Sequence, residues 1–269
     1  YYYRVIIDGI EEERSGSFTT FPEDGVKGNF VLTTGSCQET ANMDVFDRML
    51  ELEPIMMLHT GDFTYPSYQM NQDYPENYAR AQESWQRRYN EDRMKDMLLY
   101  VPIDYVADDD DNYNGNCANY RTGLTLDTSS GEVVNGWTLT AVPEGARPNW
   151  FRSYVEYFPG YQMVDTSEGL YHSFTMGNCD FFFMDTRATS SPAPEAYQYD
   201  SLSNTWTFNP DTNHRILSVN QMNWLKNGLQ NSTADWKFIV GGVPFNKTLR
   251  RIIDFGMAAQ KFTFDLNGI

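Results

Sequence analysis

Residues 55–65 read IMMLHTGDFTY, and this stretch decides how the surrounding chain folds. Its first four residues form a continuous apolar run that is too short for a helix, which predicts a buried strand. Gly61 then lets the chain turn sharply, so that Asp62 leaves the strand end and Tyr65 comes back one turn later. A carboxylate and a phenol placed in this way could share one cation. Ordinary turn chemistry explains a Gly-Asp pair after a strand equally well.

The segments around this stretch predict further strands and a helix. Residues 30–33 predict the preceding strand, and apolar side chains at helical spacing predict a helix over 42–52. Residues 101–106 form another apolar run, 180–184 are typical of a buried strand, and 236–240 predict the next strand. Strands that alternate with helices indicate an α/β fold with parallel strands and βαβ units.

The remaining segments predict one long helix, two surface insertions and one capped helix. Residues 76–99 have the pattern of a single amphipathic helix. Residues 120–149, rich in Gly, Thr and Ser, predict an inserted hairpin, and 189–213 predict a second insertion. Ser218 and Gln221 form a capping box that begins the last helix. The apolar stripe of that helix consists of Met222, Leu225 and Leu229.

Composition excludes several classes of protein. The 20 basic and 37 acidic side chains among 269 residues give a net charge of −17, which repels nucleic acid and attracts metal cations. No window is apolar enough for a membrane span. The sequons at Asn231 and Asn246 would accept glycan in a secretory compartment, so we expect a secreted or cell-surface glycoprotein.

The three cysteines and three histidines are predicted to have mainly structural roles, apart from Cys37. Cys37, Cys117 and Cys179 are too few for a disulfide scaffold and too scattered for a zinc ribbon, so one pair and one free thiol is the simplest arithmetic. His59 ends an apolar strand and is predicted to be a satisfied core residue. The other two, His172 and His214, lie beside loops and are predicted to be surface residues.

Polar side chains follow four of the predicted strands at the point where each strand ends. They are Cys37, Asp62 with Tyr65, Asp108 to Asp111, and Asp185 with Arg187. In layered α/β folds this edge binds ligands. Thiolate, phenolate and carboxylate donors without imidazole favour iron(III) beside calcium over zinc. An acidic run is also typical of a solvated surface.

These motifs resemble those of the PhoD-like alkaline phosphatases, a branch of the metallophosphatase superfamily, over most of the chain. FVLTTGSCQ resembles the strand with the metal-binding Cys, MMLHTGDFTY the Gly-Asp-x-x-Tyr element, and VPIDYVADDDD the run Trp-Asp-Asp-His-Asp/Glu. RSYVEYFP, YHSFTMGNCDFFFMDTR and QMNWLKNGLQNSTADWKFIVGGVPF follow in the same order and spacing.

The resemblance implies a four-layer α/β/β/α metallophosphatase sandwich over residues 26–269. Residues 1–25, which alternate like the last hairpin of an all-β module, would then end an N-terminal β-sandwich domain of immunoglobulin or fibronectin type. The family's closing Gly-Asp-x-His-type metal segment would follow GGVPF. Because the 269 residues contain no such segment, we expect the chain to continue beyond Ile269.

The resemblance also implies a ligand set and a reaction. Cys37, Asp62 and Tyr65 would hold Fe(3+) next to Ca(2+), and Asp109 falls on the family's second Asp, which implies a metal role. Arg187 and Asn116 are the candidate substrate-binding residues, and Asp110 and Arg187 the candidate catalytic ones.

The implied activity is hydrolysis of phosphate esters by a metal-activated hydroxide, with Arg187 neutralising charge at phosphorus. Asp110 stands where the family has His. The alternative is a catalytically impaired relative that serves as an extracellular structural or binding component.

Overall fold

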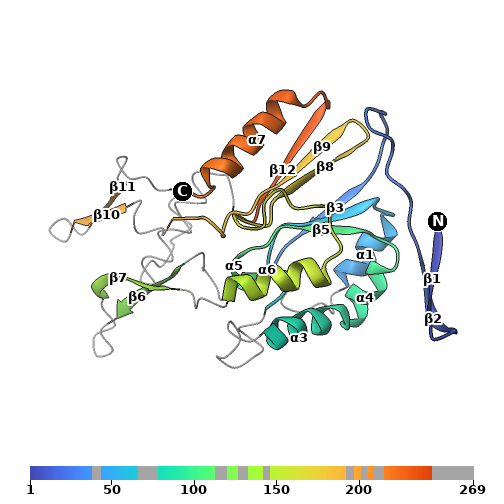
Figure 1. Ribbon diagram of the computed structural model, residues 1–269, viewed down its shortest axis with the longest axis horizontal. Coiled ribbons are helices and arrows are strands. Elements are labelled where there is room, and N and C mark those ends of the chain that lie inside the picture. Colours follow the sequence, from blue (N-terminus) through green and yellow to red (C-terminus); the bar gives the residue numbers. More distant parts are fainter. Residues whose placement is uncertain are drawn as a thin grey trace, which may run out of the picture.

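Two three-stranded sheets lie at the centre of the fold in the computed structural model (Figure 1). In the first, β3 (Leu32–Gly35), β4 (Met56–His59) and β5 (Ile103–Tyr105) run parallel in that order. In the second, β9 (Cys179–Phe183) lies between a parallel β12 (Trp236–Val240) and an antiparallel β8 (His172–Met176). The mixed α/β prediction is therefore confirmed.

The structure describes residues 1–37, 44–65, 78–112, 120–126, 133–141, 146–191, 197–200, 205–208 and 215–243. Predictions for Asn116, Cys117, His214, Asn246 and the segment 247–269 lie outside these ranges.

The two sheets pack on each other through their central strands β4 and β9, which are buried on both faces. Along β4, Met56 and Leu58 join Phe181 and Phe183 of β9 in a buried cluster between the sheets. Met57, which points the other way, belongs to a second cluster beneath the helices. A strand that is buried on both sides reads as an unbroken apolar run, which is why residues 55–58 predicted it well.

Helices cover the outer faces of both sheets. On the first sheet, the aromatic cluster that includes Trp85, Tyr105 and Trp150 is shared with α1 (Val45–Glu51), α3 (Tyr78–Tyr89), α4 (Asp92–Leu98) and α6 (Ala146–Tyr157). On the second sheet, α7 (Val219–Asn231) packs Leu225 against Phe182. Figure 1 shows the resulting order of α7, sheet, sheet and the other helices.

The single helix predicted over 76–99 is wrong. The structure has α3 and α4 there, and the chain between them leaves the helical conformation at Glu91, whose φ of −71° and ψ of 122° are extended. Amphipathic spacing persists through the break, so periodicity alone could not reveal it. The stripe of α7 also differs, because Met222 is 36% exposed.

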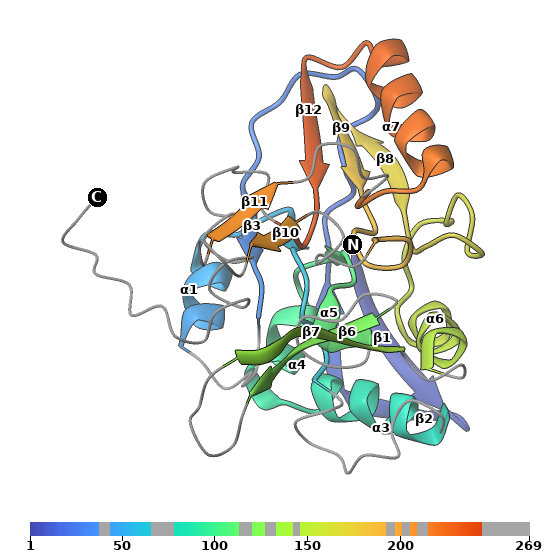
Figure 2. The ribbon, with the colours of Figure 1, turned by 90° about the vertical axis from the view of Figure 1, so that its left-hand side faces the viewer.

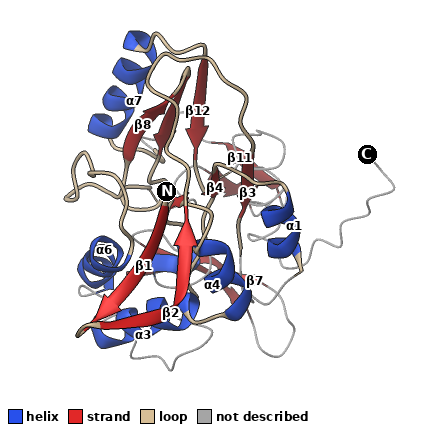
Figure 3. Ribbon diagram, turned by 90° about the vertical axis from the view of Figure 1, so that its right-hand side faces the viewer, coloured by secondary structure: helices blue, strands red, loops and turns tan. Residues whose placement is uncertain are grey.

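Three hairpins extend from the layers. The first, β1 (Tyr2–Ile7) and β2 (Ile10–Ser17), lies in front of α3 and α4 in Figure 3. It is held there by a hydrogen bond from Ser17 N to Leu99 O of 3.0 Å and an Arg14–Asp96 ion pair. That it ends a larger β-sandwich domain stays a prediction.

The other two hairpins lie within the two predicted insertions, although residues 146–149 of the first predicted insertion belong to α6. They are β6 (Tyr120–Leu126) with β7 (Val133–Ala141), and β10 (Tyr197–Asp200) with β11 (Thr205–Phe208). Both lie on the side of the molecule where the short helix α5 (Asp109–Asn112) lies, as Figures 1 and 2 show. None of the helices in the described ranges is long and apolar enough to cross a membrane.

Two histidine predictions are corrected. His172 is fully buried on β8, stacks on Phe183 and lies 2.9 Å from Asp104 through Nε2, so it is not a surface residue. His59 is buried as predicted, yet neither ring nitrogen has a hydrogen-bond partner among the described residues. The sequence around a histidine can show that the residue lies in an apolar segment. It cannot show which side chain of another sheet, such as Asp104 for His172, will be its partner.

Candidate metal centre

The carboxyl ends of the parallel strands bring the predicted ligands to one edge. Cys37 follows β3, Asp62 follows β4, and α5 begins with Asp109 after β5. The side chain of Asp108 is enclosed by two glycines, because a Cβ on Gly61 would come within 2.5 Å of its Cβ and one on Gly242 within 2.6 Å of its Cγ. Gly242 follows β12, so both sheets contribute to the site.

Left-handed backbone conformations aim two of the ligands. The φ angle is +115° at Gly61, +56° at Asp62 and +55° at Cys37. Residues with side chains rarely adopt such angles, and they cluster at functional sites. A hydrogen bond from Cys37 N to Gly61 O of 3.1 Å joins the two loops. As a result the Cys37 thiol lies 3.4 Å from Asp62 Oδ2.

A buried group of carboxylates surrounds Asp62. One oxygen each from Asp62, Asp108 and Asp109 lies within 4.8 Å of the others, and all three residues are buried. Burial, followed by the charges of Asp111, Asp109, Asp108 and Asp110, raises the pKa of Asp62 to about 8. A carboxyl group under this repulsion is suited to a cation, which removes the cost of ionising it.

Tyr65, the third predicted ligand of the first ion, is buried on the loop that carries Asp62. Its side chain is 5% exposed. Burial raises the pKa of Tyr65, and the charges of Asp62 and Cys37 raise it further. Burial also raises the pKa of the Cys37 thiol. One sulfur donor, one phenol and a shared carboxylate fit a strongly charged ion better than a divalent ion that prefers imidazole.

Asp111 holds the loops that carry these ligands. Its Oδ2 accepts hydrogen bonds from the backbone N–H of Asp62 at 2.8 Å and of Asp108 at 3.1 Å. Its Oδ1 accepts from Thr64 N at 2.6 Å and Thr64 Oγ1 at 3.0 Å. This role was not predicted individually, although an acidic residue three positions after a turn residue is a signal for it.

Arg187 supplies positive charge inside the carboxylate group. Its Nε pairs with Asp108 Oδ1, and its Nη2 lies 3.1 Å from Asp109 Oδ1. Burial lowers the pKa of Arg187, but the charges of Asp108 and Asp109 outweigh this and raise it, so the guanidinium stays charged. The loop is held by Asp185, whose Oδ1 accepts from Arg187 N at 2.9 Å.

The structure therefore brings together most of the predicted site residues. Cys37, Asp62, Asp109 and Arg187 meet as described, and Tyr65 is buried on the same loop as Asp62. The backbone N–H of Asp110 donates to Asp62 Oδ1 at 3.2 Å, and its side chain is half-buried. The predicted substrate contact Asn116 lies outside the described residues. Asp108 joins the oxygen group although no separate role was predicted for it.

The prediction of one cysteine pair and one free thiol is corrected by the structure. Cys37 and Cys179 both carry free thiols, so neither belongs to the disulfide pair that a count of three favours. Cys179 is buried in the cluster between the sheets, where a free thiol behaves as a small apolar side chain.

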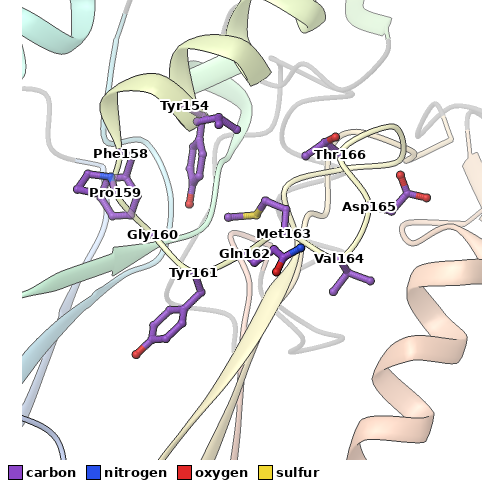
Figure 4. Close-up of a pocket in the computed structure, with 11 residues that line it drawn as sticks. Tyr154, Phe158, Pro159, Gly160, Tyr161, Gln162, Met163, Val164, Asp165 and Thr166 are labelled. Carbon is purple, nitrogen blue, oxygen red and sulfur yellow. The ribbon is translucent and has the colours of Figure 1, made fainter.

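The cavities lie apart from the carboxylates. A cavity of about 620 Å³ lies beside the segment that follows α6, and Figure 4 shows the residues between Tyr154 and Thr166 that line it. A second cavity of about 270 Å³ shares Pro159, Gly160 and Tyr161 with it. None of the described residues that line them belongs to the carboxylate group.

Comparisons with known proteins agree with this geometry. A family model described as PhoD-like phosphatase matches residues 30–263. A solved structure titled "Structure of PhoD" matches with a TM-score of 0.64 and 21% identity over 89% of this chain, which shows the shared fold. The match covers 46% of that protein, so this chain spans about half its length.

A further match is weaker. The purple acid phosphatase PPD1 from yellow lupin (Lupinus luteus) seeds has a TM-score of 0.46 and 10% identity, over 84% of this chain and 32% of that one. A search of curated proteins finds no match.

Proposed function

The chain belongs to the PhoD-like phosphatase family, and from this premise we propose that it hydrolyses phosphate esters with iron(III) and calcium. The observation that carries the proposal is the meeting of Cys37, Asp62 and Asp109 at one strand edge, after three different strands. Residues this far apart in the chain gather there only because the sheet is parallel.

The donor types suggest how the ions would be shared. Cys37, Asp62 and Tyr65 would hold iron(III), and the oxygens of Asp62, Asp108 and Asp109 would suit calcium. When bound, the ions would supply Lewis-acid charge and lower the pKa of a coordinated water. Asp62 would then be the shared ligand, in keeping with the burial and the repulsion from the neighbouring carboxylates that raise its pKa in the absence of metal.

Arg187 is proposed to bind the phosphate group. A guanidinium has five N–H donors, and the ion pairs with Asp108 and Asp109 engage only two of its nitrogens. Its side chain is 22% exposed, so the remaining donors can face an anionic ester and neutralise the charge that develops at phosphorus. Asp110, half-buried beside Asp62, is the proposed acid or base for protons of the substrate or leaving group.

The finer features of the fold and the location belong to the same proposal. The order of helix, sheet, sheet and helices supports a metallophosphatase sandwich over residues 26–269, with 1–25 as the end of an N-terminal β-domain. The exposed Asn231 at the end of α7 is accessible to glycan, which supports a secreted or cell-surface glycoprotein.

Metal analysis and ester hydrolysis test the proposal together. The purified protein is expected to contain iron and calcium and to cleave nitrophenyl phosphate mono- or diesters. Asp62→Asn, of similar size, is expected to lose the iron and at least about 100-fold in rate, because the shared ligand is gone. Asp235→Asn, an exposed acid far from the site, serves as control. Equal rates in wild type and Asp62→Asn would refute the proposal.

A second candidate is supported by one observation. Asp110 occupies the position where the family has His, and an acid beside an anionic ester adds repulsion where an imidazole could donate a proton. On this alternative the chain is an impaired relative with a binding or structural role. Hydrolysis that appears only in Asp110→His would favour the alternative, whereas measurable wild-type activity that falls in Asp110→His favours the enzyme.

A further inference from the structure

Arg88 is a buried cation behind the metal centre with incomplete hydrogen bonding. Its side chain on α3 is 2% exposed, and its Nη1 lies 2.5 Å from Glu91 Oε2. Its buried Nε has no hydrogen-bond partner among the described residues. A buried guanidinium is costly unless its charge is compensated, so one surface carboxylate leaves its position unexplained.

Two aromatic rings on the side of the proposed metal ligands also stabilise the positive charge of Arg88. The Arg88 guanidinium carbon lies 6.0 Å from the centre of the Tyr65 ring and 5.8 Å from that of Phe63. Phe63 and Tyr65 lie on the same loop as Asp62, immediately after β4. A cation at this distance from an aromatic ring is attracted to it, and the attraction grows when the ring carries the negative charge of a phenolate.

We propose that Arg88 is a positioning residue that holds the Tyr65 ring in place as a ligand to iron. This inference rests on the proposed function, since it concerns one ligand of the same site. Glu91, whose side chain is 19% exposed, pairs with the guanidinium, and the same guanidinium lies over the Tyr65 ring. Ligands to metals are commonly oriented by such outer partners.

The visible absorption of an iron(III) phenolate provides a direct readout. Protein loaded with iron(III) is expected to show a phenolate-to-iron charge-transfer band that Tyr65→Phe abolishes. In Arg88→Met the band is expected at longer wavelength, because loss of the nearby positive charge raises the energy of the phenolate electrons. Iron affinity is expected to fall by about tenfold or more. Arg87→Met, which removes the exposed neighbouring charge, should leave both unchanged.

Two further variants separate charge from packing. Glu91→Gln removes the opposing carboxylate and is expected to move the band to shorter wavelength, the opposite direction to Arg88→Met. Arg88→Lys keeps the charge and is expected to restore most of the wild-type position. If Arg88→Met does not fold, Glu91→Gln and Arg88→Lys provide the test. If Arg88 had a purely structural role, Arg88→Met and Glu91→Gln would not shift the band in opposite directions.

The outcomes distinguish this inference from the function on which it rests. A wild-type protein that binds no iron(III) overturns the proposed ligand set and this inference with it. A wild-type band that Tyr65→Phe abolishes, but that Arg88→Met and Glu91→Gln leave at the same wavelength and iron affinity, overturns the role of Arg88 alone.

Discussion

A single buried side chain, that of Asp111, connects the two loops that carry the proposed metal ligands. It is fully buried and accepts four hydrogen bonds from Asp62, Thr64 and Asp108. Burial is the main reason that its pKa rises to about 7, while the hydrogen bonds from Thr64 and Asp108 oppose the rise. Asp111 thus holds the backbone of the loops that carry the proposed ligands. The sequence of four consecutive aspartates does not by itself show which of them has this role.

Asp111→Asn is therefore expected to destabilise the protein strongly. An amide has one acceptor oxygen, and its NH2 group would face backbone donors, so buried N–H groups lose their partners. We expect the free energy of unfolding in urea to fall by about 3 kcal/mol. Asp92→Asn, on the exposed surface of α4, is the matched control. A loss below about 0.5 kcal/mol would show that other groups hold the loops.

His59 makes a second prediction, on acid stability. Burial, with a smaller contribution from the charge of Arg88, lowers its pKa to about 3. Below pH 6.5 the unfolded chain binds a proton at this residue that the folded protein does not, so the contribution of His59 to stability falls as pH falls. Each pH unit below 6.5 costs about 1.4 kcal/mol, down to the folded pKa.

The test is His59→Phe, which keeps an aromatic ring beside Phe63 and Tyr105. Between pH 6.5 and 4.5 we expect wild type to lose about 2 kcal/mol more than the variant in urea unfolding. Above pH 7.5 the two stability curves should run parallel, which is the internal control. Identical slopes at acid pH would mean that His59 is not held neutral in the fold.

Helix α7 supports the loop of Arg187 through its first turn. Ser218 Oγ accepts from Gln221 N at 3.0 Å, which is half of the predicted capping box. The Gln221 side chain does not return to Ser218. Its Oε1 accepts from Asp185 N at 3.0 Å and its Nε2 donates to Asp185 O at 3.0 Å. Asp185 in turn holds the N–H of Arg187.

Gln221→Leu is expected to cost about 2 kcal/mol of stability, because it leaves the buried N–H and C=O of Asp185 unpaired. It is also expected to raise KM for phosphate esters more than it lowers kcat, since the loop of Arg187 loses support. Urea unfolding and steady-state kinetics measure the two effects. Asn223→Leu, exposed on the same helix, should change neither.

Elements were predictable from the sequence where one local pattern determined them. The strands β4 and β12 are apolar enough, and short enough, to be placed within one residue. The break at Glu91 and the burial of His172 depend on contacts with other elements. For the site, turn residues after strands identified Asp62 and Arg187. The roles of Asp111 and Arg88 required knowledge of which loops and helices meet.

The molecule as a whole concentrates negative charge at one end of its sheets. Five carboxylates, Asp62 and Asp108 to Asp111, lie together in a chain of net charge −17. Among the described residues around them, Arg187 and Arg88 bring opposite charge from the two sides. The fold has placed these groups where each raises the cost of ionising the others.

Chelation should therefore reverse how stability depends on pH. Without metal, Asp62 and Asp111 have pKa values raised to about 8 and about 7, whereas in the unfolded chain they ionise near pH 4. From pH 5 to 8 the folded protein then holds protons that the unfolded chain has released, so its stability falls as pH rises. The drop should exceed about 1.4 kcal/mol, the value of one pKa unit.

Saturating calcium should remove this fall, because the ion binds the ionised carboxylates and favours the folded state more as they lose protons. Urea unfolding at pH 5, 6.5 and 8, with chelator or with calcium, measures both curves. Asp62→Asn with chelator should show a shallower fall than wild type, since one of the two repelled groups is gone. If the chelated wild type is as stable at pH 8 as at pH 5, the carboxylates do not repel one another as this fold requires.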